Sequence, residues 1–157
     1  MTEVLAGVTD AVVRRPSLLP GWTVGHVVTH LGRNAESVHE RLTGLARGEV
    51  VEQYVGGVEG WAAAIDAGAD RPAALIIDDA IDWARRLDDT FTNVPDECWA
   101  GRVLTVRGEE HAAAALPLRR WREVEVHLVD LGMGLSWADW SPGLVERALP
   151  GLVAGLS

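Results

Sequence analysis

The chain has almost no cysteine, with Cys98 alone among 157 residues. An intramolecular disulfide is therefore impossible, and a cysteine-rich structural zinc site is excluded. Cys98 is followed by a tryptophan, and we expect it to be a small packed residue rather than a nucleophile. No apolar run approaches the roughly 20 residues that cross a bilayer, so we expect no membrane partner.

Positive charge is also scarce, and lysine is absent altogether. The 14 basic residues are all arginine and face 23 acidic residues, which gives a formal net charge of −9. Nucleic-acid binding depends on clustered cations, so we expect no nucleic-acid partner. The N-terminal stretch places acidic residues before arginines, the reverse of a secretory signal, and predicts a cytoplasmic protein.

Hydrophobic periodicity predicts four amphipathic helices, at about residues 2–13, 23–46, 72–91 and 112–131. Thr23 is a favourable N-cap for the second helix, and Pro72 suits the first turn of the third. Pro117 implies that the fourth helix either begins near it or kinks there. A short helix is expected around residues 58–66.

Four helices joined by long crossover connections predict an all-α four-helix bundle. Residues 98–108 are β-like and bounded by glycine, which indicates an extended connection or a short hairpin. We assign residues 1–135 to the bundle and residues 136–157 to a tail. The tail is expected to contain a short helix that starts at Ser141 and Pro142 and meets Pro150.

Glu123 and His127 stand four residues apart on the predicted fourth helix, so their side chains share one face. Asp130 falls on the same stripe. A carboxylate and an imidazole with related spacing bind metal in helical bundles. The alternative is a surface pair worth about 0.2–0.5 kcal/mol.

Two histidines also lie four residues apart on the predicted second helix. His30 is at the edge of the apolar stripe, whereas His26 lies further towards solvent. If the second and fourth helices are neighbours, His30 joins Glu123 and His127 as a third ligand. Three protein ligands leave a coordination position open, as in catalytic zinc sites. Two nitrogens and a carboxylate suit zinc, with nickel and iron as alternatives.

Two segments carry a family resemblance. The run from Leu19 to Leu31, followed by Asn34, resembles the start of the second helix in the mycothiol-dependent maleylpyruvate isomerase family. The run from Arg122 to Gly132 is similar to that family's second motif, in the same order and at roughly the same spacing. The resemblance covers about residues 1–140 and implies the family's N-terminal DinB-like bundle.

The resemblance also implies a set of site residues. His30, Glu123 and His127 match the metal ligands, with Glu123 in place of one of the three histidines of related DinB-like proteins. His26 matches a position that is not a ligand. Asp130 and Asn34 are candidates for supporting the ligands from outside the metal's own shell, although a simple surface carboxylate is an equal alternative for Asp130.

The implied activity uses zinc and a thiol. In the family, the open metal position takes the thiol of mycothiol, whose thiolate adds to an activated double bond so that a cis bond becomes trans. The expected partners are therefore a small-molecule thiol and an electrophilic substrate. The expected reaction is isomerisation or thiol S-transfer.

The family's isomerases carry a second, C-terminal α/β domain that contributes an arginine to substrate binding, and these 157 residues include no such domain. We interpret the chain as either a short member or a fragment, which favours S-transfer because that reaction needs no such arginine. The alternative function is a non-catalytic metal-binding bundle that binds a ligand or partner. A third reading is that the His and Glu side chains never converge. The sequence is compatible with a homodimer but does not select one.

Overall fold

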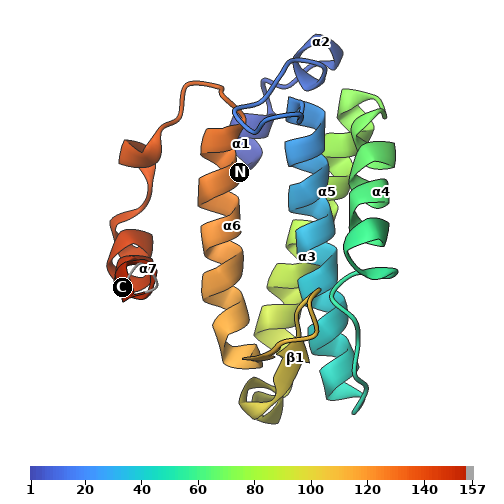
Figure 1. The fold of residues 1–157 in the computed structure, drawn as a ribbon, viewed down its shortest axis with the longest axis vertical. Helices are drawn as coiled ribbons and strands as arrows, with labels where there is room; N and C mark the ends of the chain where they lie inside the picture. Colours follow the sequence, from blue (N-terminus) through green and yellow to red (C-terminus); the bar gives the residue numbers. More distant parts are fainter. Residues whose placement is uncertain (155–157) are drawn as a thin grey trace.

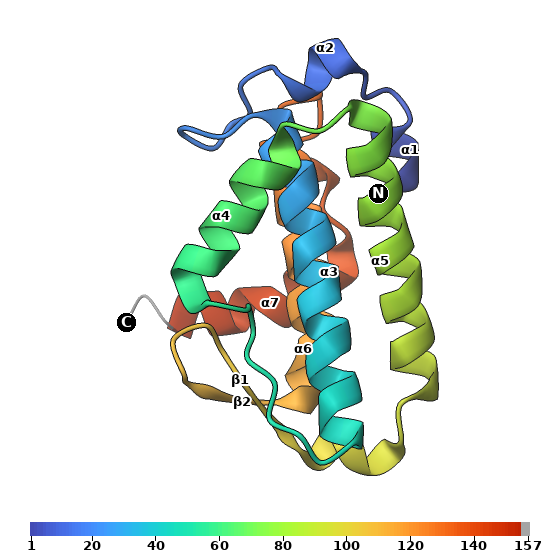
Figure 2. The ribbon, with the colours of Figure 1, turned by 90° about the vertical axis from the view of Figure 1, so that its right-hand side faces the viewer.

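Four long helices form the body of the protein in the computed structural model, which describes residues 1–154 and, of these, the side chains of 1–149. They are α3 (Val24–Ala46), α4 (Gly57–Ala69), α5 (Ala73–Asn93) and α6 (Leu116–Asp130). Helix α3 is central and packs against the other three. Figure 2 shows α4 and α5 flanking α3, with α6 behind it. The predicted all-α bundle is confirmed.

Helix α3 begins where the sequence predicts. The hydroxyl of Thr23 accepts a hydrogen bond from the backbone N–H of His26, and the His26 ring accepts one from the backbone N–H of Thr23. This reciprocal capping box satisfies two N–H groups that a helix start otherwise leaves unpaired. The His26 ring is therefore occupied by hydrogen bonds at the N-terminus of α3.

The N-terminal segment differs from the prediction of one helix over residues 2–13. It forms two short helices, α1 (Thr2–Leu5) and α2 (Asp10–Val13), because Thr9 caps a new start by accepting from the backbone N–H of Val12. The fourth member of the bundle is instead α4, which is longer than the predicted 58–66. Its apolar side chains Ile65 and Ala69 are buried.

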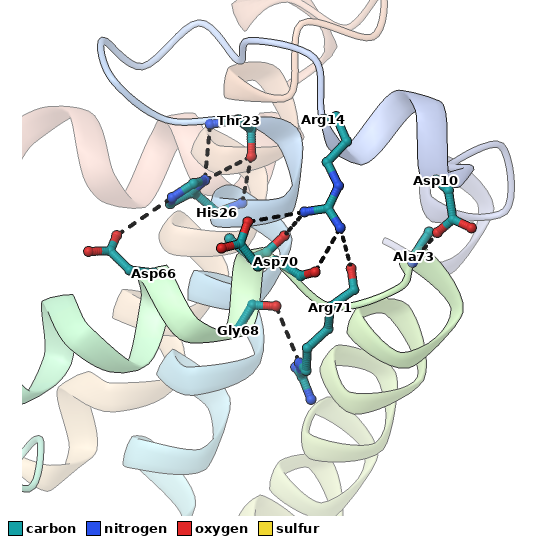
Figure 3. A network of polar contacts seen from close by, with 10 residues as sticks. Asp10, Arg14, Thr23, His26, Asp66, Gly68, Asp70, Arg71 and Ala73 are labelled. Atoms are coloured by element: carbon teal, nitrogen blue, oxygen red, sulfur yellow. Dashed lines mark hydrogen bonds and ion pairs between the residues drawn. The ribbon is translucent and has the colours of Figure 1, made fainter.

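The N-terminal segment fastens the turn between α4 and α5 (Figure 3). Arg14 donates to the backbone oxygens of Ala69 and Asp70, at 3.0 and 2.7 Å. The carboxylate of Asp10 accepts from the backbone N–H of Ala73, at 2.7 Å, and so caps α5. Residues of α2 and its C-cap thus bind the end of α4 and the start of α5.

The connection after α5 forms a short hairpin, one of the two alternatives expected for residues 98–108, but its second strand lies beyond that segment. A 3₁₀ turn, η1 (Asp96–Ala100), carries the buried Cys98, and the strands β1 (Arg102–Leu104) and β2 (Glu110–Ala112) then pair antiparallel. A second 3₁₀ turn, η2 (Ala113–Ala115), leads directly into α6. Pro117 lies in the first turn of α6, where its missing N–H costs nothing, so the helix begins there rather than kinking.

The residues after α6 turn back onto it. A 3₁₀ turn, η3 (Trp137–Asp139), precedes α7 (Pro142–Ala154), which starts where predicted and continues past Pro150. The Trp140 indole donates to the Glu125 carbonyl at 3.2 Å, and the Ser141 backbone N–H donates to the Glu125 carboxylate at 2.7 Å. Helix α7 lies beside α6, outside the four-helix body (Figure 1). Within the described residues, no helix is both long and apolar enough to traverse a membrane.

The backbones of α2 and α4 come close to α3 at Gly25, and a substitution there tests how tightly these helices pack. A Cβ at Gly25 would lie 2.8 Å from the Ala69 oxygen and 3.2 Å from the Val13 oxygen. We expect Gly25→Ala to lower the free energy of unfolding by about 1–3 kcal/mol, measured by urea denaturation, although alanine is the better helix former. Gly7→Ala, which meets open space, should change it by less than about 0.5 kcal/mol. Equal losses in the two variants would contradict this account.

Candidate metal centre

The site lies where the hydrophobic core is interrupted. On α3, the buried apolar residues up to Val28 belong to one cluster and those from Ala35 onwards to a second. On α6, Leu116 belongs to the second cluster and Leu128 to the first. Between the clusters, α3 carries the buried polar side chains of Thr29, His30 and Asn34 beside the buried Leu31, and α6 carries half-buried polar side chains that face them.

His30, Glu123 and His127 meet in this interval. The His30 Nε2 atom is 3.2 Å from Glu123 Oε2, and His127 Nε2 is 3.4 Å from the same oxygen. One potential ligand atom from each residue lies within 4.8 Å of the other two, and among the described residues this is the one such His, Cys, Asp or Glu group. The two imidazole rings meet edge to face, with centroids 4.6 Å apart.

These distances fit a divalent metal ion. Nitrogen and oxygen ligands 2.0–2.2 Å from a tetrahedral zinc lie roughly 3.3–3.5 Å from each other. The two measured N···O separations, 3.2 and 3.4 Å, are close to that spacing. Imidazole nitrogens and a carboxylate oxygen are also donors that zinc accepts. The residues present therefore form a group that could hold such an ion without large rearrangement.

Asp130 orients one of the two imidazoles. Its Oδ2 lies 2.8 Å from His127 Nδ1, a distance at which the ring N–H donates to the carboxylate. In the metal-free group the Nε2 atom also carries a proton when it donates to Glu123, and loss of that proton frees the Nε2 lone pair for a metal ion. Carboxylates that hold a metal-binding histidine in this way fix its tautomer and raise its basicity. Asp130 thus contacts one ring of the group, and its supporting role stays a prediction.

Aromatic rings surround the other imidazole. His30 is 6% exposed, and its ring centroid lies 5.7 Å from that of Trp22 and 5.9 Å from that of Trp61. Its Nδ1 atom is buried and finds no hydrogen-bond partner among the described residues. The tryptophans restrict the ring and keep water away from it. Neither was identified as a site residue from the sequence, which placed Trp61 only in the short helix expected around residues 58–66.

The electrostatics of the group favour a charged carboxylate between two imidazoles. Burial by itself would raise the pKa of Glu123, but hydrogen bonds from His127 and His30 lower it overall. Burial lowers the pKa of His30. Burial also acts to lower the pKa of His127, yet the hydrogen bond and charge of Glu123, with those of Asp130, raise it overall. At neutral pH a fixed negative charge therefore faces both rings.

Asn34, the other predicted supporting residue, is engaged elsewhere. Its side-chain oxygen accepts a hydrogen bond from Arg120 Nη1 at 2.9 Å, and the same nitrogen donates to the Leu31 carbonyl. Arg120 is itself only 6% exposed. Asn34 thus holds a buried arginine next to the group rather than a ring of the group.

The remaining histidines stay outside the group. His26 caps α3 and lies 3.6 Å from Asp66 (Figure 3). His39 contacts the Thr90 hydroxyl at 2.6 Å on the α5 side of α3, and His111 lies on β2. The sequence assigned a metal-ligand role to none of these three.

The chain is similar in sequence to one protein family and in structure to two solved structures. The family model described as the mycothiol maleylpyruvate isomerase N-terminal domain matches residues 1–132. A crystal structure of the mycothiol-dependent maleylpyruvate isomerase superposes with a TM-score of 0.86 at 27% identity, and a histidine-to-alanine mutant of that enzyme superposes with 0.86 at 26%. Each match covers 92% of this chain and 60% of the solved chain. No curated protein sequence matches.

Proposed function

Because the chain belongs to the family of mycothiol maleylpyruvate isomerase N-terminal domains, we propose that it is a zinc-dependent enzyme that uses mycothiol for isomerisation or S-transfer. The observation that carries this proposal is the position of Glu123 Oε2, 3.2 Å from His30 Nε2 and 3.4 Å from His127 Nε2. The chain spans about 60% of the length of the solved isomerase structures, so the activity named for those structures is a proposal for this chain.

Zinc held by His30, Glu123 and His127 would supply a Lewis acid that keeps a coordinating thiol deprotonated near neutral pH. The protein's own side chains have separate tasks. Asp130 retains the proton on His127 Nδ1, and Glu123 supplies the negative charge between the rings. Trp22 and Trp61 exclude water on the His30 side, which strengthens every charge interaction within the site.

The proposed chemistry belongs to the thiolate and its substrate. The sulfur forms a bond to one carbon of an electron-poor double bond, and the π electrons move to the conjugated carbonyl. Rotation about the new single bond and expulsion of the thiolate restore the double bond in the trans form, so the thiol is regenerated. In S-transfer the adduct instead takes a proton and leaves. Neither route requires an oxidant or reductant.

Two further predictions from the sequence belong to the same proposal. They are the cytoplasmic location and the division into a bundle of residues 1–135 and a tail of residues 136–157. The family match over residues 1–132 supports this boundary.

Metal analysis combined with a thiol assay tests the proposed function. After incubation with zinc and gel filtration, we expect elemental analysis to find about one zinc per chain. Mycothiol and a cis-configured, carbonyl-activated alkene should then give the trans isomer or the thiol adduct, followed by NMR. Treatment with a chelator should stop the reaction, and added zinc should restore it. Bound zinc without any thiol-dependent conversion would instead indicate a non-catalytic metal-binding module.

A further inference from the structure

A cavity lies between α3, α4 and the connection that joins them, residues 47–56 (Figure 2). Its volume is about 410 Å³, within the roughly 300–1,000 Å³ of small-molecule pockets. None of the three residues of the metal group lines it, so it is distinct from the metal site. Its lining contains two aromatic rings and three carboxylates, from Tyr54, Trp61, Glu36, Glu40 and Glu52.

The two aromatic residues lie side by side in the lining of this cavity. The ring centroids of Tyr54 and Trp61 are 6.0 Å apart, and the ring planes are tilted by 38°. Tyr54 belongs to the connection and Trp61 to α4, so the pair forms where these two segments meet. Apolar side chains extend this wall, from Val51, Val55 and Ala64. Because the face of an aromatic ring is electron-rich, such a wall attracts cations that carry apolar groups.

The charge of the lining is negative. Arg33 is its one basic residue among those described, and its guanidinium binds Glu36 at 2.5 Å and Asp79 of α5 at 2.6 Å. Among the described residues, neither Glu40 nor Glu52 forms an ion pair. Three carboxylates and one guanidinium leave the lining with a surplus of two negative charges.

The pKa of Glu36 reflects this surplus. Burial raises the pKa of Glu36, and the charges of Asp79 and Glu40 act in the same direction. The charges of Arg33 and His39 oppose this rise without cancelling it. The cavity therefore has room for a further positive charge, which would reduce the repulsion between its carboxylates.

We propose that this cavity binds a small organic ammonium ion. The carboxylates attract the positive charge, and the aromatic wall contacts the alkyl groups around the nitrogen, as aromatic rings do in recognising quaternary ammonium groups. Glu40 and Glu52 are exposed, and exposed charges alone hold any cation weakly. The rings of Tyr54 and Trp61 therefore supply the preference for an organic cation. This ligand class differs from the thiol and the electrophile of the proposed function, and the inference does not depend on that function.

Choline and its neutral analogue 3,3-dimethylbutan-1-ol test the need for a positive charge, because the two molecules have nearly the same shape. NMR titration of the full chain should detect choline binding that weakens with added salt. The neutral analogue should bind about tenfold more weakly, since it gains neither the attraction to the ring faces nor the attraction to the carboxylates.

Variants of the lining test the two contributions separately. Tyr54→Leu removes a ring and should weaken choline binding about tenfold, whereas Tyr54→Phe keeps the ring and should leave binding within about twofold. Glu40→Gln and Glu52→Gln should each weaken it about threefold. Glu97→Gln is the matched control, because Glu97 is an exposed carboxylate on η1 that lies outside the cavity.

Four results would overturn the inference. They are the lack of detectable choline binding, equal binding of the neutral analogue, a loss in Tyr54→Phe as large as in Tyr54→Leu, and losses in Glu40→Gln and Glu52→Gln no larger than in Glu97→Gln. Circular dichroism checks that each variant keeps its helices. The two glutamate variants change exposed side chains, so they test the inference even where Tyr54→Leu does not fold.

Discussion

Replacement of His30 or His127 by alanine should abolish zinc binding where the unmodified chain holds about one ion. Each substitution leaves two protein ligands on one side of an open site, and catalytic zinc sites use three. The measurement is elemental analysis after gel filtration, with circular dichroism to verify that the helices remain. Both variants must lose the ion, because the two residues come from different helices and either helix alone supplies too few ligands.

Two matched variants make this result specific. His26→Ala removes a histidine one turn from His30 on the same helix and should leave the zinc in place, at a cost of about 1 kcal/mol in capping. Asp130→Asn keeps all three ligands and should weaken zinc affinity by about 10–100-fold, because the orientation, tautomer and basicity of His127 are no longer fixed by a carboxylate. Zinc retained by both His30→Ala and His127→Ala would refute the assignment.

Zinc affinity should fall steeply as the pH is lowered from 8 to 5. Protonated imidazole cannot bind a metal, so each histidine below its pKa costs about tenfold in affinity per pH unit. As the pH falls, His127 is protonated before His30, because its pKa is raised above the ordinary histidine value of about 6.5. A proton on His127 then competes with zinc for this ring. His30, whose pKa is lowered by burial, adds its effect only at lower pH. Undiminished affinity well below pH 5 would exclude both histidines as ligands.

Without zinc, the folded chain should become more stable as the pH is lowered from 8 to about 6.5, whereas zinc affinity falls over the same range. Because the folded-state pKa of His127 is raised, its protonation stabilises the fold fully below about pH 6.5, and this contribution is lost as the pH rises through the folded pKa. The lowered pKa of Glu123 stabilises the fold above about pH 4.3, and this contribution is lost in acid. The difference in melting temperature between zinc-loaded and chelator-treated protein should therefore widen from pH 6 to pH 8. A constant difference would contradict the assignment.

The sequence was sufficient to predict the three longest helices, α3, α5 and α6. Helix α3 and the start of α6 carry their signals locally, in the cap at Thr23 and in Pro117. The spacing of Glu123 and His127 fixes their shared face, and the family motifs indicated His30 as their partner across the bundle.

The features that could not be predicted from the sequence depend on tertiary packing. The apolar pattern of residues 2–13 continues across a point where Thr9 starts a new helix, and periodicity does not detect such a break. Helix α4 is rich in alanine and glycine, so its pattern was too weak to identify it as a bundle member. The tryptophans around His30 became visible only when separate segments came together.

The two sides of the metal group are far apart along the chain, because His30 and Glu123 are separated by 93 positions in the sequence. Closing a loop of this length costs conformational entropy, so we expect this contact to form late in folding. An interaction absent from the transition state slows unfolding and leaves the folding rate almost unchanged. An ion held between α3 and α6 would accordingly extend the lifetime of the folded chain, and its loss would be seen as faster unfolding rather than slower folding.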